Sequence, residues 1–477
     1  MKKLRALTLI LSAFMLTGCF EDGDDIPIQT AEINDFVWKG MSIYYLYKDE
    51  MPDLANDRFT NNSEYTEYLE MFDSPFDLFN SLKYQPGIVD QFSWMVNDYI
   101  ELERNFSGIS TTNGMEFSLF KKPNEGNKAI GVVRLVLPNS DAANKGIKRG
   151  DIFYAVDGIE LFYNSDTDNN TGLLLSENYT ISLGFFDDKG TADEGDDSVE
   201  PLDRDIQLSK FEYEENPIHS SKILEVDGEK VGYLMLNGFT AGYDDELNAV
   251  FGDFKANNVQ HLVLDLRYNP GGRVTIETYL ASMITGQFIG QIFSKLIYNS
   301  NFETTDFNFV SKIENGEDIN ALNLDKVYVL TTGSSASASE GLINGLNPYI
   351  EVIQIGTNTR GKTQASRTLY DSPENNYRRE GANPRHTYAM QPLVADGVNR
   401  DNVKVPSTGL TPDIDFTEQK FNYGRIGEED EPFLAVALAE IGGTTNKFQT
   451  SKSKQSPTEM LFDSNEFRPL KGGLVID

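Results

Sequence analysis

The chain has 477 residues, 39% of them hydrophobic, which is enough for two to four domains with apolar cores. It carries 41 basic and 74 acidic residues, and the resulting net charge of −33 would repel nucleic acid and bare anionic lipid surfaces. Nucleic acid is therefore disfavoured as a partner. A single cysteine also leaves no disulfide within the chain, so apolar cores must hold the fold.

The first residues have the layout of an export signal. Lys2 and Lys3 give a basic start, a short apolar run follows, and small residues precede Cys19. The stretch LTGC, which ends at Cys19, resembles a bacterial lipobox, in which the cysteine is lipidated and becomes the mature N-terminus. The resemblance implies a signal peptide over 1–18 and a lipid on Cys19. Residues 19–29 are polar and acidic and are expected to form a tether. Phe20 in place of an aspartate after Cys19 resembles outer-membrane lipoproteins and implies an exported protein on the periplasmic face or the cell surface. The alternative is an ordinary signal peptide with a chance cysteine; no later segment has 18 uninterrupted apolar residues, so a lipid would be the sole membrane attachment.

Residues 30–106 have a helical pattern. In INDFVWKGMSIYYLYKDEMP, apolar residues including Phe36 and Ile43 recur at helical spacing, and a second helical run is predicted over 63–82. An aromatic stripe at this spacing could hold a ligand, but it is far more typical of a packed core. We therefore expect a helical N-terminal domain.

Short strands predominate in the next region, residues 107–212. GMEFSLF alternates, IGVVRLVL is typical of a strand, and VDG is typical of a tight turn. VLPNSDAANKGIKRGDIFYAVDGIEL resembles a PDZ domain, a module that binds an extended C-terminal peptide as an added strand. The resemblance implies that backbone amides near Asn113, Gly114 and Met115 receive the peptide carboxylate. The alternative is a small β-domain with no role in peptide binding.

One acidic stretch in this region raises the question of a metal site. Asp166, Asp168, Asn170 and Glu177 stand at calcium-loop offsets, but the glycine falls one place late and no flanking pair of helices is evident. A loop that caps a short helix explains the stretch more simply. We expect neither a metal nor a cofactor.

From residue 213 to 442 strands alternate with helices. HLVLDL, KVYVL and EVIQI are apolar strands, and helical patterns separate them. This alternation predicts a layered α/β domain with buried parallel strands. Its chemistry is expected in the loops at the carboxyl ends of those strands.

Two of these loops are candidates for catalysis. LDLRYNPGG ends in a glycine pair, which lets backbone N–H groups point into a cavity as an oxyanion hole requires. TTGSSASASEG holds four serines between a strand and a helix, an arrangement that presents a nucleophile at a helix N-terminus.

A nucleophilic serine needs a base. The three histidines, His219, His261 and His386, do not obviously face the serines. Lys362 follows another apolar strand, and the run from 356 to 369 contains no acid, which permits the neutral lysine that a general base requires.

Three stretches together resemble the carboxy-terminal processing peptidases, also called tail-specific proteases. They are LDLRYNPGG, SSASASE followed by RGK, and STGLTPDID near the end. The resemblance covers about residues 114–440, and the helical part resembles that of exported lipoprotein members from Bacteroidetes. It implies a multidomain α/β protein with a crotonase-like α/β peptidase core, a PDZ β-domain and an N-terminal helical domain.

The same resemblance assigns roles to residues. The family's nucleophile corresponds to Ser337, and its lysine base, 25 residues later, corresponds to Lys362. The oxyanion donors fall on the N–H groups of Ala338 and Gly272. Many members orient the lysine with a glutamine four residues after it. The chain departs from this pattern, since Ser366 is at that position and the nearest glutamine is Gln364, and either is a candidate.

The expected function is that of a lipid-anchored serine-lysine endopeptidase. Its substrates would be unstructured or C-terminal regions of polypeptides, captured by the PDZ domain, and the oligomeric state is left open. The alternatives are a catalytically silent peptide-binding lipoprotein and a carrier of apolar ligands with the same fold. Residues 443–477 have too little periodicity to place and are expected to form a C-terminal tail, for which packing on the core and a mobile segment are both open.

Overall fold

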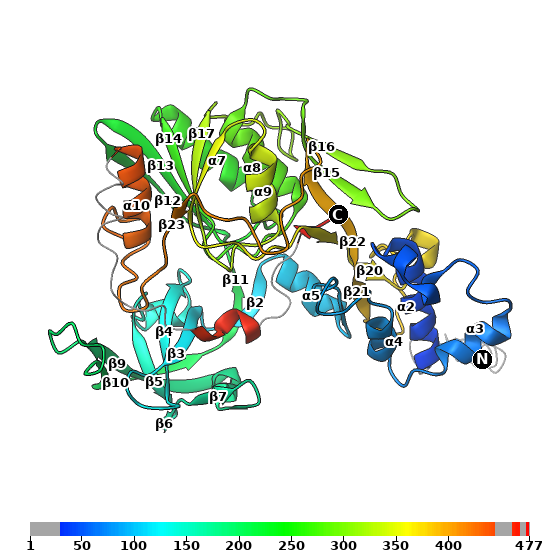
Figure 1. The fold of residues 1–477 in the computed structure, drawn as a ribbon, viewed down its shortest axis with the longest axis horizontal. Coiled ribbons are helices and arrows are strands. Elements are labelled where there is room, and N and C mark those ends of the chain that lie inside the picture. Colours follow the sequence, from blue (N-terminus) through cyan, green and yellow to red (C-terminus); the bar gives the residue numbers. More distant parts are fainter. Residues whose placement is uncertain (1–28, 444–459, 468–473, 477) are drawn as a thin grey trace, which may run out of the picture. The chain divides into compact units, whose positions relative to one another are not determined.

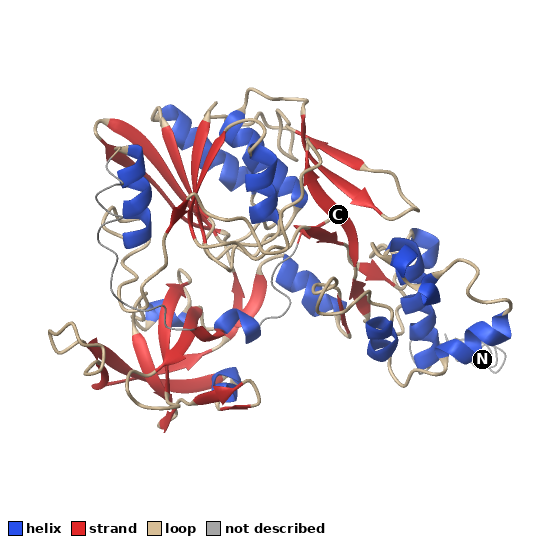
Figure 2. Cartoon of the chain, viewed as in Figure 1, coloured by secondary structure: helices blue, strands red, loops and turns tan. Residues whose placement is uncertain are grey.

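The computed structural model describes residues 29–443, 460–467 and 474–476, and the chain divides into two compact units. The N-terminal unit comprises residues up to Tyr99 together with Thr368–Pro392. The larger unit comprises Ile100–Arg367 and Leu393–Asp477. Helices and strands occur in both units, so the multidomain α/β expectation is confirmed (Figure 2).

The N-terminal unit is built on helix α2 (Thr30–Tyr44), against which α3 (Asn62–Leu69) and α4 (Pro75–Ser81) pack. The apolar stripe of α2 is buried, with Phe36 and Val37 among its core residues. The stripe is therefore core, as its helical spacing indicated.

The single helical run predicted over 63–82 is two helices. The break falls before Pro75, which has no N–H to donate and clashes with the preceding turn. Ser74 starts the new helix, because its Oγ accepts a hydrogen bond from the Asp77 N–H at 3.2 Å.

A small antiparallel sheet completes this unit. Strand β21 (Ala389–Gln391) lies between β1 (Trp94–Val96) and β20 (Leu369–Tyr370). Residues 368–392 therefore belong with the helical part and not with the α/β domain, whose expected range was 213–442. The pairing joins strands almost 300 residues apart in sequence, so no local pattern could indicate it. The short 3₁₀ turns of the unit are η2 (Lys48–Glu50), η3 (Pro52–Leu54) and η5 (Pro373–Asn375).

The larger unit contains a β-domain, which we define as the elements from β3 to β10 and β24. It is preceded by α5 (Tyr99–Phe106) and β2 (Ile109–Thr112), and β2 pairs with β11 (Phe211–Glu214). Its sheet has the order β10-β9-β5-β4-β3-β24, and β6 pairs with β5. The strands are β3 (Met115–Lys121), β4 (Ala129–Val136), β5 (Ile152–Val156), β6 (Ile159–Glu160), β9 (Asn178–Asp187), β10 (Ser198–Ser209) and β24 (Met460–Asp463). The other elements are α6 (Asp141–Asn144), η4 (Thr171–Leu175) and a hairpin of β7 (Tyr163–Ser165) and β8 (Asp168–Asn169).

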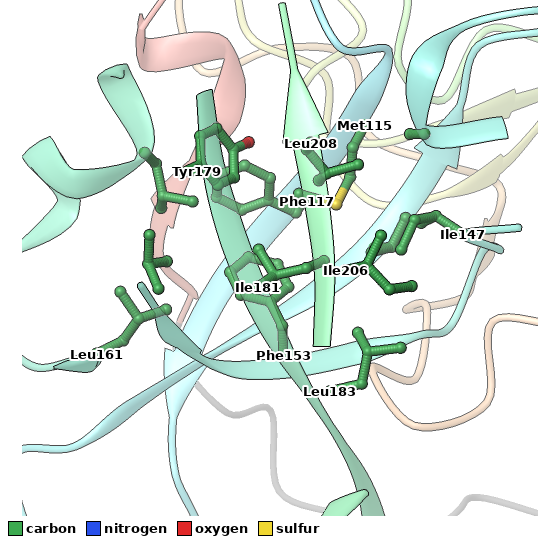
Figure 3. Close-up of a cluster of buried hydrophobic side chains, with 14 of the residues drawn as sticks. Met115, Phe117, Ile147, Phe153, Leu161, Tyr179, Ile181, Leu183, Ile206 and Leu208 are labelled. Atoms are coloured by element: carbon green, nitrogen blue, oxygen red, sulfur yellow. The ribbon is translucent and has the colours of Figure 1, made fainter. Parts of the chain in front are cut away.

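The β-domain has its own apolar core. Figure 3 shows side chains from several strands meeting on one face of the sheet, including Phe117, Phe153 and Ile181. The rings of Phe117 and Phe153 meet edge to face with centroids 5.2 Å apart. Gly131 leaves room for Phe153, because a Cβ there would lie 2.0 Å from that ring. The β-domain therefore has an apolar core of its own within the larger unit.

Part of the C-terminal region joins this sheet. Strand β24 lies antiparallel to β3, with Met460 opposite Phe120 and Asp463 opposite Ser118, and a short 3₁₀ turn, η7 (Ser464–Phe467), follows. The buried Asp463 carboxylate pairs with Arg134 of β4. The range 443–477 is therefore more than a tail, although 444–459, 468–473 and 477 lie outside the described residues.

The α/β core of the larger unit is built on a sheet with the order β12-β13-β14-β17-β18-β23. The antiparallel hairpin of β12 and β13 forms one edge, and all other pairs are parallel. The strands are β12 (Ile218–Val226), β13 (Glu229–Leu236), β14 (His261–Asp265), β17 (Lys326–Thr331), β18 (Glu351–Gly356) and β23 (Ile414–Asp415). The predicted buried parallel strands are confirmed.

Helices cover both faces of this sheet (Figure 1). On one face, α10 (Pro432–Ile441) packs against β14, β17 and β18. On the other lie α7 (Asp244–Ala256), α8 (Val274–Thr285) and α9 (Ala338–Leu346). A second sheet, with the order β16-β15-β22-β19-β25, contacts α9 through β15 and β22. Its strands are β15 (Ile292–Tyr298), β16 (Thr305–Asn308), β19 (Gln364–Ser366), β22 (Leu393–Asn399) and β25 (Leu474–Val475).

Candidate active site

Ser337 lies at the sharp turn between β17 and α9. Its backbone has φ 61° and ψ −111°, a conformation that costs a non-glycine residue on the order of 1–3 kcal/mol. Only 2% of the residue is exposed, and its Oγ makes no hydrogen bond with any described residue. A strained backbone that holds an unpaired hydroxyl at a helix N-terminus is typical of a nucleophile.

The neighbouring serines hold this turn in place. The Ser335 hydroxyl donates to the Leu266 carbonyl at 2.8 Å, and the Ser339 hydroxyl donates to the Asn269 carbonyl at 3.0 Å. The Ala336 N–H donates to the same carbonyl at 3.1 Å. These hydrogen bonds therefore hold the serine-rich turn against the loop that follows β14.

That loop brings the glycine pair against the nucleophile. A Cβ on Gly271, whose φ is +108°, would lie 2.7 Å from the Cβ of Ser337. The Gly271 N–H is occupied, because it donates to Asn269 Oδ1 at 2.8 Å. The N–H groups of Gly272 and Ala338 make no hydrogen bond with described residues. These are the two amides expected as oxyanion donors.

Lys362 lies in the loop after β18 and is 6% exposed. The Gly361 and Lys362 amides both donate to the Glu340 side chain, at 2.7 and 2.9 Å. Gln364 and Ser366 are the first and last residues of β19. No hydrogen bond joins the Lys362 side chain to Ser337 Oγ in this structure.

Glu340 links the two loops, and sequence reasoning missed it. Its carboxylate also accepts from the Ser337 N–H at 2.8 Å and from the Thr359 hydroxyl at 2.5 Å. Burial raises the pKa of Glu340, and the four hydrogen bonds that it accepts oppose this rise. The sequence held a signal for it, because Ser337 and Glu340 have the Ser-x-x-Glu spacing of a capping box.

The histidines occupy other places. His261 pairs with Glu229 at 2.7 Å, and His386 pairs with Asp371 at 3.1 Å in the N-terminal unit. Burial lowers the pKa of His219, so it is neutral near pH 7. None of the three hydrogen-bonds to Ser337, as expected.

The loop expected to receive a peptide carboxylate lies at the start of β3. Gly114 needs its small size, because a Cβ there would lie 2.0 Å from Ser140 Cβ. The two relevant amides are engaged: the Gly114 N–H donates to Thr112 Oγ1 and the Met115 N–H donates to Asn113 Oδ1, both at 3.0 Å. In this structure the loop therefore offers neither amide to a ligand.

Two other expectations concern a metal and the membrane. The stretch containing Asp166 and Asp168 forms the β7–β8 hairpin, and among the described residues no group of three or more potential ligands could hold a metal. Cys19 lies outside the described residues. Within the part that the structure describes, no helix is long and apolar enough to cross a membrane.

Two family models match the chain, and together they cover more than half of it. The model of peptidase family S41 matches residues 230–415, which include every element around Ser337. The model of the peptidase S41 N-terminal domain matches residues 32–94.

Individual relatives agree with these matches. A carboxyl-terminal-processing protease of Picosynechococcus sp. is 27% identical over 344 residues, which are 71% of this chain and 72% of the relative. The chloroplastic carboxyl-terminal-processing peptidase 3 of Arabidopsis thaliana is 26% identical over 60% of this chain and 50% of its own length. The crystal structure of a putative S41 protease from Bacteroides fragilis has the same fold, with a TM-score of 0.69 and 24% identity over 86% of this chain and 97% of that one. The chain therefore belongs to peptidase family S41, a family of serine peptidases.

Proposed function

We propose that the chain is a serine-lysine endopeptidase that cleaves unstructured or C-terminal regions of polypeptides through an acyl-enzyme. The observation that carries the proposal is the turn at Ser337, which has a strained backbone and a buried hydroxyl that pairs with no described residue. The N–H groups of Ala338 in this turn and of Gly272 in the adjacent glycine loop also have no partner among the described residues. Acyl transfer needs these parts together.

In the proposed mechanism, neutral Lys362 takes the proton from Ser337 Oγ as the oxygen attacks a peptide carbonyl. The negative charge that develops on the carbonyl oxygen is stabilised by the N–H groups of Gly272 and Ala338 and by the N-terminus of α9. The protonated lysine then returns the proton to the leaving amine, and water hydrolyses the acyl-enzyme. The backbone N–H groups of Ser337 and Lys362 both donate to Glu340, which holds the two loops together, and the mechanism requires the lysine side chain to reach Ser337 Oγ.

The β-domain is the proposed site of substrate capture. A peptide that added to the edge of β3 opposite β4 would compete with β24, which pairs with that edge. Capture of its carboxylate would also require the Gly114 and Met115 amides to leave their present acceptors. Equal affinity for free-acid and amidated peptides would exclude carboxylate capture.

We also propose that a lipid on Cys19 anchors the protein in the outer membrane. The support is the stretch LTGC after a signal-like segment. Incorporation of labelled palmitate into the wild type but not into Cys19→Ser is the expected result, and equal labelling would refute it.

Cleavage of an unfolded protein tests the catalytic proposal. Ser337→Ala and Lys362→Ala should each reduce the turnover of unfolded casein by at least about a thousandfold. Ser334→Ala is the matched control, because Ser334 is half-buried in the same turn and its hydroxyl has no assigned role. Cleavage that persists in both variants would refute the mechanism. Binding without cleavage by the wild type would instead favour a catalytically silent member of the fold.

A further inference from the structure

A carboxyl group without a partner lies next to the nucleophile. Glu277, on α8, is 2% exposed, and its side chain forms no hydrogen bond or ion pair with any described residue. Its Oε1 lies 2.6 Å from the point where a Cβ on Gly341 would be, so the glycine in α9 makes room for it. A buried carboxyl without a partner costs several kcal/mol of desolvation and calls for a functional explanation.

Glu277 and Ser337 line the same narrow pocket, which has a volume of about 30 Å³. A cavity of roughly 10–15 Å³ can hold one water molecule, so this pocket has room for about two small heavy atoms. Apolar side chains line it as well, namely Val274, Leu296, Val398 and Val405.

The charges around the pocket leave Glu277 uncompensated. Lys295, on β15, is the other charged residue that lines it, and its Nζ donates to Asn402 Oδ1 at 2.9 Å. Burial is the one cause that raises the pKa of Glu277, which lies well above its ordinary value. Burial therefore favours the protonated form of this carboxyl, which can both donate and accept a hydrogen bond.

We propose that Glu277 is a specificity-determining residue, which hydrogen-bonds a serine side chain of the substrate at the residue whose carbonyl Ser337 attacks. This inference rests on the proposed function. This side chain is the one we assign to the pocket, because Ser337 lines the pocket and the side chain branches from the carbon next to the attacked carbonyl carbon. A serine side chain consists of two heavy atoms, a CH₂ that suits the apolar walls and a hydroxyl that suits a protonated carboxyl. Leucine or lysine would exceed the volume, and lysine would also require an ionised carboxyl in a buried site.

A matched peptide series tests the pocket. The peptides differ only at the residue before the cleaved bond, which is serine, alanine, leucine or lysine. The wild type should favour serine over alanine about fivefold in kcat/KM, the size of one neutral hydrogen bond, and should cleave the leucine and lysine peptides least. Glu277→Gln should keep this preference, whereas Glu277→Leu, of similar size, should lose it. No serine preference in the wild type, or an unchanged preference in Glu277→Leu, would overturn the inference.

A binding assay separates this inference from the proposed function. Uncleavable complexes of the same peptides with Ser337→Ala should show the same serine preference in their dissociation constants. Selective binding without cleavage by the wild type would refute the peptidase proposal and support the pocket. Cleavage of all the peptides without a serine preference would support the peptidase proposal and refute the pocket. Absence of both binding and cleavage would overturn both the peptidase proposal and the pocket.

Discussion

At the scale of single residues, the site depends on how buried carboxyls are paired. Glu340 accepts four hydrogen bonds from the loops of Ser337 and Lys362, whereas Glu277 accepts none from described residues. The first carboxyl fixes two loops relative to each other. The second is left available to a ligand.

Glu340→Gln should lower both activity and stability. The amide would turn an NH₂ group toward two of the donors that now face a carboxylate oxygen, so the free energy of unfolding should fall by about 2 kcal/mol. We expect kcat to fall more than tenfold with little change in KM, because the variant misplaces the catalytic groups without changing the pocket. Urea unfolding and steady-state kinetics measure both effects, with the exposed Glu317→Gln as the control. A normal kcat would contradict the positioning role.

Glu277→Gln should change how stability depends on pH. Glu277 has a raised pKa in the folded protein, so from about pH 4 upward the unfolded chain releases this proton while the folded chain keeps it. The folded wild type therefore loses stability as the pH rises toward the folded pKa, and the glutamine variant does not. The difference in melting temperature, variant minus wild type, should grow between pH 4 and pH 8. A constant difference would show that Glu277 is ionised in the folded state.

At the scale of elements, β24 closes one edge of the β-domain sheet. It covers the edge of β3, and the Phe117 N–H donates to Ser464 Oγ at 3.0 Å just beyond it. An exposed strand edge can pair with other chains, but here β24 of the same chain covers the edge of β3. The buried ion pair between Asp463 and Arg134 holds β24 in this position.

Asp463→Ala should loosen β24. Among the described residues, the Arg134 guanidinium would keep one carboxylate partner, Glu116 at 3.4 Å, so the strand should open more often. Hydrogen exchange should accelerate at the β3 amides of residues 118–120, and unstructured peptides should bind more tightly. Glu160→Ala removes a carboxylate of β6, which pairs with β5 and not with β24, and serves as the control. Unchanged exchange would show that β24 is held by other contacts.

The sequence predicted the helices, strands and loops around the site better than it predicted which strands pair and which side chains meet. Apolar strands followed by loops are local patterns, so β14, β17, β18 and the loops with Ser337 and Lys362 were correctly placed. The pairing of β1 with β21 and of β24 with β3 joins distant segments, and nothing local encodes it. Glu277 could have been noticed as a lone acid in the apolar stretch VTIETYLASMI, but its lack of a partner depends on the packing of α8 against α9.

At the scale of the larger unit, a buried ionic network joins the β-domain to the α/β core. Arg149 of the β-domain pairs with Glu418 at 2.5 Å and donates to Tyr268 OH at 2.8 Å. Arg267, fully buried, pairs with Glu418 and with Glu431. Burial opposes ionisation of Glu418, but the two arginines outweigh it and lower its pKa to about 2. The network fixes the β-domain against the core by charge as well as by packing.

Arg149→Met should make the protein more sensitive to acid. The pKa of Glu418 lies below its ordinary value, so its contribution is present above about pH 4.5 and is lost as the pH falls toward 2, a loss of about 3 kcal/mol. Removal of one arginine should raise that pKa and move the acid-unfolding midpoint to higher pH. Circular dichroism against pH measures the midpoint, with Lys145→Met, which breaks an exposed pair, as the control. An unchanged midpoint would show that Arg267 alone sets the pKa.

The central claim is that Lys362 activates Ser337 as the nucleophile. Reaction with a fluorophosphonate, followed by peptide mass spectrometry, tests it most directly, because the reagent labels only an activated serine. We expect one fluorophosphonate label per chain, on Ser337, in the wild type and in Ser334→Ala. The label should be lost in Lys362→Ala. Labelling of another serine, or full labelling of Ser337 in the absence of Lys362, would contradict it.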